Sequence, residues 1–124
     1  MCKVTIPWQH VVSKNDKLTV VRGRPRLSTK YKNAKEAICW LSKATWSKPA
    51  TWPVAVEVLV FPPNKRHYDI FNVTQLIFDG LEGAAYEDDY QISYGSVKRM
   101  DIDRENPRVE VTVQPLTDSL LSST

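Results

Sequence analysis

The feature of this sequence that most constrains its fold is the run Val54–Phe61, Val-Ala-Val-Glu-Val-Leu-Val-Phe. Its four valines alternate along the chain, so they share one face of a β-strand. The opposite face is also mostly apolar and carries a single charge, at Glu57. A strand that is apolar on both faces is buried on both sides, so we predict a central strand of a sheet. The pair Pro62-Pro63 ends this strand.

The other elements can be placed around this central strand. Before it, we predict a strand at 3–8, a loop with a weak strand at 11–27 and a helix at 28–45. After it, we predict a helix at 70–82 and strands at 91–98 and 108–114. Ser28 is the predicted N-cap of the first helix, and Gly83 closes the second. The charged linker Arg99–Pro107 is compatible with a hairpin loop. The order β-β-α-β-α-β-β indicates an α+β domain with one mixed sheet and two helices.

Chain length and composition set the class of protein. A chain of 124 residues can bury a core without disulfides or a structural metal. Two cysteines, Cys2 and Cys39, are too few for a secretory disulfide framework, and the longest apolar runs are far shorter than a membrane span. We therefore expect a soluble, intracellular domain over residues 1–114, followed by a polar tail over residues 115–124 that frays.

The net charge of +3 conceals a strong asymmetry along the chain. Residues 1–66 carry 13 Lys and Arg against 3 Asp and Glu, whereas residues 67–124 carry 4 against 11. A basic half suits a polyanion, and an acidic half beside it favours divalent cations that offset the repulsion. Arg22, Arg24 and Arg26 share one face if their stretch is extended. The alternative is that both halves are solvated surfaces of opposite sign, and charge alone does not decide.

Carboxylates gather around the second predicted helix. On a helical wheel a narrow polar stripe lies opposite the apolar core stripe, and its members are Asn72, Gln75, Asp79 and Glu82. Asp69 stands at the start of this helix, and Asp88-Asp89 follow its end after a short loop. The four aspartates come together only if that loop folds back over the helix. Clustered carboxylates favour Mg²⁺ or Mn²⁺, which can activate water for phosphodiester hydrolysis.

Each of these residues also has a purely structural interpretation. Asp69 is equally a candidate N-cap, and Asp79 is a candidate for exposed helix surface. Asp88 and Asp89 are ordinary turn formers. His67, in a basic loop, is interpreted as a phosphate contact rather than a metal ligand.

Three motifs stand in order around the second helix. They are Asp69-Ile70-x-Asn72, then Phe78-Asp79-Gly80-Leu81-Glu82-Gly83, then Tyr86-Glu87-Asp88-Asp89-Tyr90-Gln91-Ile92. The upstream segments that complete the layout are Pro7-Trp8, Ser13-Lys14-Asn15, Pro62-Pro63 and Lys65-Arg66. Together these motifs resemble the RusA-type Holliday junction resolvases over roughly residues 3–114.

The resemblance implies an α+β homodimer that binds branched DNA at four-way junctions and cuts it hydrolytically with Mg²⁺ or Mn²⁺. It also implies a cytoplasmic location in a bacterial or phage-infected cell. Asp69, Asp88 and Asp89 match the family's metal ligands. Asp79 matches a further acidic residue of the catalytic set. The residues implied in DNA binding are Lys14, Asn15, Arg22, Arg24, Arg26, Lys65, Arg66, His67, Asn72 and Gln75.

The sequence departs from the family pattern at two positions. Phe71 stands where the best-known members have a second Asp, and Gln75 stands where they have a Lys. Phe71 offers no metal ligand, and Gln75 offers no positive charge. A second hypothesis is therefore a junction-binding protein with weak or no nuclease activity, and a third is an interaction module unrelated to nucleic acid. Phe71 either packs in the core or faces the DNA.

Overall fold

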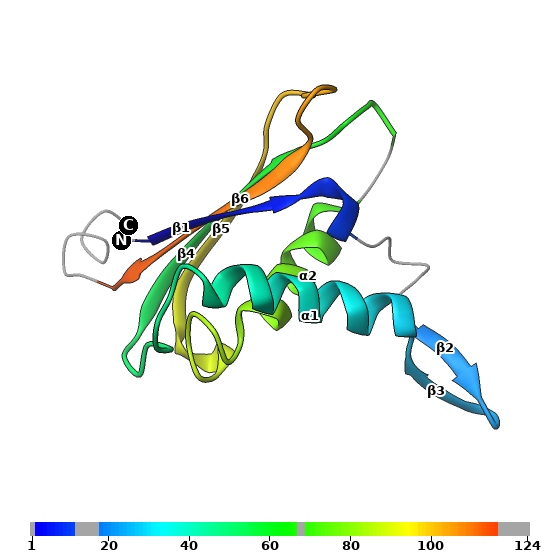
Figure 1. Ribbon diagram of the computed structural model, residues 1–124, viewed down its shortest axis with the longest axis horizontal. Coiled ribbons are helices and arrows are strands. Elements are labelled where there is room, and N and C mark those ends of the chain that lie inside the picture. The colour runs from blue at the N-terminus through cyan, green and yellow to red at the C-terminus, as the bar shows by residue number, and fades with distance from the viewer. Residues whose placement is uncertain (1, 12–17, 67–68, 117–124) are drawn as a thin grey trace.

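The computed structural model describes residues 2–11, 18–66 and 69–116 (Figure 1). Its helices and strands are β1 (Cys2–Pro7), β2 (Leu18–Val21), β3 (Arg24–Leu27), α1 (Thr29–Lys43), β4 (Val54–Phe61), α2 (Ile70–Leu81), β5 (Ile92–Arg99) and β6 (Arg108–Pro115), with short 3-10 helices η1 (Trp8–His10) and η3 (Asp89–Gln91). The predicted α+β class, with a mixed sheet and two helices, is confirmed. Lys14, Asn15, His67 and the chain from residue 117 onward lie outside the described residues.

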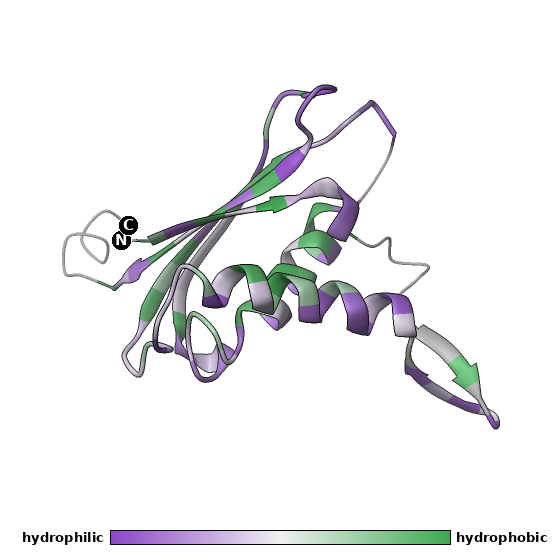
Figure 2. Cartoon of the chain, in the orientation of Figure 1, coloured by the Kyte–Doolittle hydropathy of each residue, from purple (hydrophilic) through white to green (hydrophobic). Residues whose placement is uncertain are grey.

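The central strand is where the sequence places it. The sheet order is β1-β6-β4-β5, and β4 pairs parallel with β5 and antiparallel with β6. The four valines of β4 are buried and share the core with residues of both helices, such as Ile38 and Ile77. Glu57, on the opposite face, is exposed. Figure 2 shows the apolar residues concentrated on the sheet and on α2, whereas the outer side of α1 is largely hydrophilic.

The region predicted as one weak strand is instead a hairpin. Strands β2 and β3 pair with each other as a separate sheet, which projects from the start of α1 (Figure 1). Arg22 (φ 53°) and Gly23 (φ 76°) form its two-residue turn. Consecutive positive φ angles are what such a tight hairpin turn requires. The expectation that three arginines share one strand face is therefore wrong: Arg22 lies in the turn, and only Arg24 and Arg26 lie on β3.

The linker Arg99–Pro107 is not a hairpin loop, because β4 lies between the two strands that it connects. Strand β5 runs parallel to β4 and ends beside it, so the linker has to cross the end of β4 to reach β6. Two backbone hydrogen bonds hold this crossing: Met100 N–H donates to Val60 O (2.8 Å), and Asp103 N–H donates to Pro62 O (2.9 Å).

The two helices begin and pack as their sequences dictate. The Ser28 hydroxyl accepts a hydrogen bond from the Tyr31 N–H at 3.1 Å, which confirms the predicted cap of α1. Gly80 of α2 lets α1 approach closely, since a Cβ there would lie 2.5 Å from the Ile38 side chain and 3.2 Å from the Lys35 carbonyl oxygen. Within the described part of the chain, no helix combines the length and apolar character needed to cross a membrane.

Candidate active site

The turn that follows α2 carries two of the four predicted aspartates, Asp88 and Asp89. Gly83 begins it with a φ of 88°, a conformation that glycine adopts at little cost. Gly83 N–H then donates to Tyr86 O at 2.7 Å. The Tyr86 side chain is fully buried, and its hydroxyl donates to Phe78 O at 2.6 Å. The turn is therefore bound to the helix that precedes it.

One buried glutamine fixes the second half of this turn. Gln91 is only 7% exposed, and its Oε1 accepts from the N–H groups of Glu87 (3.0 Å) and Asp88 (2.9 Å). Its Nε2 donates to the carbonyl oxygens of Ala50 (2.8 Å) and Trp52 (3.1 Å). All the strong hydrogen-bonding capacity of this amide is thus used. The backbone that carries Asp88 is held against the loop before β4.

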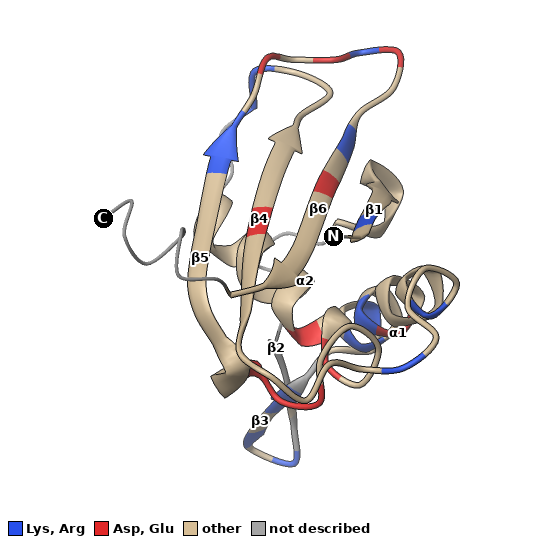
Figure 3. Cartoon of the chain, turned by 90° about the vertical axis from the view of Figure 1, so that its left-hand side faces the viewer, with Lys and Arg blue, Asp and Glu red and all other residues tan. Residues whose placement is uncertain are grey.

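Three exposed carboxylates meet at this turn: Glu82 at the end of α2, and Asp88 and Asp89 after it. Each offers one oxygen that lies within 4.8 Å of the other two. We call these three residues the acidic group. Figure 3 shows acidic residues along the turn after α2, and basic residues on α1 and β3.

Two carboxylates of the acidic group, Glu82 and Asp89, have raised pKa values, and neighbouring carboxylates contribute to both. The pKa of Glu82 is raised first by partial desolvation and then by neighbouring negative charges, of which Asp89 acts most strongly. The pKa of Asp89 is raised first by its hydrogen bond with the Asp88 side chain, then by desolvation and the charges of Asp88 and Asp79. A nearby cation would lower these pKa values. The acidic group therefore carries negative charge that its surroundings do not offset.

This donor set fits a hard divalent cation. An ion that binds oxygens at about 2.0–2.6 Å keeps any two ligand atoms within about 5 Å of each other. The three oxygens of the acidic group lie within 4.8 Å of one another and so meet that limit. Carboxylate oxygens are also the ligands that Mg²⁺ and Mn²⁺ prefer.

Asp79 lies beside the acidic group but is held by α1. The Tyr31 hydroxyl donates to Asp79 Oδ2 at 2.6 Å and so ties the two helices together. Burial, followed by this hydrogen bond, raises the pKa of Tyr31, which keeps the hydroxyl protonated as a donor. The charge of Asp79 still reaches Glu82 and Asp89, because it contributes to raising both of their pKa values.

Asp69 is not brought into the acidic group. Its Oδ1 accepts from the Phe71 N–H at 2.8 Å, so it caps the start of α2. Glu82 stands at the other end of the same helix, about 20 Å away at 1.5 Å per residue. The loop after α2 does not fold back far enough to bring Asp69 to Asp88 in the same chain.

The remaining motif residues lie along α2. Phe71 is 71% exposed, which excludes the core-packing alternative. Gln75 is also exposed. Asn72 Nδ2 is buried and has no hydrogen-bond partner among the residues described.

The basic residues predicted to bind DNA lie in two places. Arg22, Arg24 and Arg26 are exposed on the projecting hairpin. Lys65 and Arg66 are exposed in the connection that leads from β4 to Asp69. The hairpin projects from the start of α1, and Lys65 and Arg66 precede the start of α2 (Figure 1).

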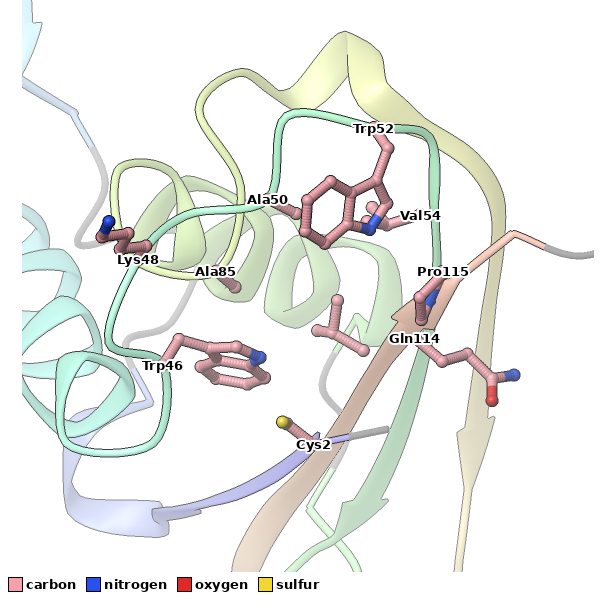
Figure 4. Close-up of a pocket in the computed structure, with 10 residues that line it drawn as sticks. Cys2, Trp46, Lys48, Ala50, Trp52, Val54, Ala85, Gln114 and Pro115 are labelled. Carbon is pink, nitrogen blue, oxygen red and sulfur yellow. The ribbon is translucent and has the colours of Figure 1, made fainter.

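A hollow with a mainly apolar lining lies near the loop before β4 (Figure 4). It has a volume of about 170 Å³, and its lining includes Trp46, Trp52 and Ala85. The polar ends of Lys48 and Gln114 point away from it in Figure 4. Among the residues that the structure describes, its lining includes the thiol of Cys2 but no carboxylate and no histidine, so the acidic group is the better candidate for hydrolysis.

Glu82 was not among the predicted metal ligands, and no role was predicted for Gln91. Glu82 was on the polar stripe of α2, one turn after Asp79, which was the available signal. Gln91 stands three residues after Asp88, the spacing of a capping box, and the structure shows that box. No pattern in the sequence indicated the bond between Tyr31 and Asp79.

Comparison with known proteins adds one match. The family model described as "Endodeoxyribonuclease RusA" matches residues 7–114 of the 124. Among curated proteins, none matches the sequence. The matched segment contains every carboxylate of the site described above.

Proposed function

The chain belongs to the RusA family of endodeoxyribonucleases, which resolve Holliday junctions, and on this premise we propose that its cleavage depends on a divalent cation held by Glu82, Asp88 and Asp89. The observation that carries the proposal is the acidic group itself. Its three oxygens lie within 4.8 Å of one another. The raised pKa values of Glu82 and Asp89 indicate charge that a cation would offset.

Each part of the site has its own task in this proposal. A bound Mg²⁺ or Mn²⁺ would supply positive charge to the scissile phosphate and an activated water. The acidic group holds the ion, and Gln91 holds the turn that presents Asp88. Asp79, fixed by Tyr31, adds negative charge beside the ligands.

The DNA contacts are proposed on both sides of this centre. Phosphate contacts position the nucleic acid, and Lys or Arg supply them without reading sequence. The proposed contacts are Arg22, Arg24, Arg26, Lys65 and Arg66, together with Lys14, Asn15, His67, Asn72 and Gln75. We place this activity in residues 1–114 and assign no part of it to the tail at 115–124. We also propose the cytoplasm of a bacterial or phage-infected cell as its location.

We propose a homodimer as the active form, since a two-fold protein presents two sites to a roughly two-fold junction. Asp69 bears on this point, because about 20 Å of helix separates it from Glu82 within one chain. A ligand role for Asp69 therefore requires the acidic group of a second protomer.

Mixing two inactive variants tests the role of Asp69. Asp69→Asn and Asp89→Asn proteins are purified separately, then unfolded and refolded together. If the site is shared between protomers, half of the mixed dimer's sites are intact, and nicking returns. If Asp69 acts within its own chain, neither site is intact and the mixture stays inactive. Full activity of Asp69→Asn alone would remove Asp69 from the site.

The main test uses a synthetic four-way junction and a linear duplex of the same sequence. Binding selective for the junction, with paired nicks near the branch point only when Mg²⁺ or Mn²⁺ is present, supports the proposal. Cleavage that persists in EDTA would overturn the metal dependence. Absence of junction binding at low salt would instead support an interaction module unrelated to nucleic acid.

A second candidate is a protein that binds junctions without cutting them. The exposure of Phe71 and Gln75 favours it, because both departures from the family pattern face solvent, where DNA can meet them. Selective junction binding without cuts in either metal would establish this candidate. Gln75→Lys would then be expected to create measurable cleavage.

A further inference from the structure

An open cleft separates α1 from the end of α2. Its volume is about 500 Å³; the α1 wall carries two lysines and one glutamate, and the α2 wall carries two carboxylates. The lining residues are Lys32, Lys35, Glu36, Cys39, Asp79 and Glu82. Since Glu82 belongs to the acidic group, the cleft opens directly beside the proposed hydrolytic centre.

The close packing of the helices fixes where the basic wall stands. Gly80 lies against the Lys35 carbonyl oxygen, as its missing Cβ would lie 3.2 Å from that atom. This contact brings the Lys35 backbone beside the segment of α2 that carries Asp79. Lys35 is half-buried, and Lys32 precedes it by about one helical turn on the same side of α1.

Neither lysine is neutralised by the carboxylates across the cleft. No ion pair joins Lys32 or Lys35 to any carboxylate within the described ranges 2–11, 18–66 and 69–116. Opposite charges that face each other across open space are both available to a ligand.

A DNA phosphate is the anion that such a wall would accept at this place. Next to the acidic group, a phosphodiester meets strong repulsion unless cations face it from the other side. α2 offers no such cation, because Gln75 is neutral and stands one turn before Asp79. Lysine is a compact cation on a flexible stem, suited to a phosphate oxygen.

We propose that Lys35, with Lys32 beside it, contacts the phosphate next to the acidic group and supplies the positive charge that α2 lacks at Gln75. This inference rests on the proposed function, because it takes the acidic group to be the hydrolytic centre. It assigns to α1 a catalytic contact in addition to its role in the core.

Replacing Lys35 by Met removes the charge and keeps an unbranched stem. We expect the single-turnover cleavage rate of Lys35→Met to fall about a hundredfold, the usual cost of one transition-state electrostatic contact. Junction affinity should change only a few-fold, because other phosphate contacts remain. The matched control is Lys43→Met, an exposed lysine of the same helix outside the cleft, which should cleave normally. Equal rates in the two variants would overturn the proposal.

Restoring a lysine on α2 tests whether the two positions serve the same phosphate. Adding Gln75→Lys to Lys35→Met should restore the cleavage rate to within about tenfold of that of the unsubstituted protein. In the unsubstituted protein, Gln75→Lys should increase the cleavage rate by a smaller factor. An equal gain in both backgrounds would mean independent contacts, and would contradict the assignment. Lys35→Arg should retain most of the activity.

Occupation of the cleft can be measured without cleavage, because Cys39 lines it. In a Cys2→Ser background, bound junction should slow the alkylation of Cys39, and Lys35→Met should lose that protection while Lys43→Met keeps it. If the protein never cleaves but Lys35→Met still loses the protection of Cys39, the phosphate contact is upheld and the proposed function is wrong. If the protein cleaves but the protection of Cys39 is the same in Lys35→Met, the proposed function is upheld and the phosphate contact is wrong.

Discussion

Carboxylates have opposite surroundings in two regions of this protein. At the start of β6, Arg108 donates hydrogen bonds to Asp103 and Glu110, both at 2.8 Å. Lys3 of β1 also pairs with Glu110. We call Lys3, Asp103, Arg108 and Glu110 the paired group. In the acidic group, by contrast, carboxylates contact one another.

The pKa values follow this difference. In the paired group, the pKa of Asp103 is lowered first by a backbone hydrogen bond from Asn106, and that of Glu110 first by the Lys3 side chain. In the acidic group, the pKa values of Glu82 and Asp89 are raised. The same residue types thus serve the fold where the chain supplies cations, and remain available to an external cation where it does not.

The largest expected effect is loss of cleavage when the acidic group is neutralised. Asp88→Asn or Asp89→Asn should lower the cleavage rate by about two to three orders of magnitude and spare junction binding. Asp103→Asn, from the paired group, is the matched control and should cleave normally. The rates are compared in single-turnover assays with Mg²⁺. Cleavage by Asp88→Asn at the rate of the control would show that the acidic group is not the active site.

The fold was largely predictable, because its elements depend on local patterns. The alternation of Val54–Phe61 and the Ser28 cap both report on neighbouring residues in the chain. The hairpin was missed because Arg22 is a non-glycine residue with positive φ, which nothing in its side chain signals. The crossing at Arg99–Pro107 depends on strand order, a property of the whole sheet.

The carboxylates of the candidate site were predictable in type, but their grouping was not. The sequence predicts Asp69, Asp88 and Asp89 as one set, whereas within one chain the structure groups Asp88 and Asp89 with Glu82 and leaves Asp69 at the other end of α2. This grouping depends on the length of α2 compared with the reach of the turn that follows, which the sequence alone does not show. The separation of paired from unpaired carboxylates was equally hidden. Arg108 meets Asp103 only because the linker crosses the end of β4.

The second expected effect is stabilisation by the metal. Mg²⁺ or Mn²⁺ at a hundredfold excess over its Kd should stabilise the protein by about 2.7 kcal/mol, because the unfolded chain has no preformed site. Asp88→Asn should lose most of this gain, whereas Glu110→Gln should keep it. Thermal unfolding with and without EDTA measures the difference. An equal rise in Tm for both variants would mean that the cation binds elsewhere.

The third effect concerns the turn that assembles the acidic group. Gln91→Met should cost about 1–3 kcal/mol, since the amide's buried backbone partners lose hydrogen bonds. The cleavage rate should fall as well, but by a smaller factor than in Asp88→Asn. Urea unfolding and single-turnover rates are measured on the same preparation. A variant that is less stable yet cleaves at the normal rate would show that Gln91 serves the fold alone.

The smallest effect separates the two regions by their response to pH in metal-free buffer. Carboxyls with lowered pKa values, such as Glu110, stabilise the fold above about pH 4, and this contribution is lost as pH falls through their folded-state pKa. Carboxyls with raised pKa values, such as Asp89, oppose folding at neutral pH, and this cost is relieved as pH falls through their folded-state pKa.

Single substitutions should therefore move Tm in opposite directions. At pH 7 in EDTA, Asp89→Asn should raise Tm and Glu110→Gln should lower it, each by about one or two degrees because the groups are exposed and screened. Both differences should shrink as pH approaches about 4, where the carboxyls of the unfolded chain also take up protons. A loss of Tm in Asp89→Asn at pH 7 would show that this carboxylate already has a stabilising partner. The acidic group would then resemble the paired group and would have little charge left for a cation.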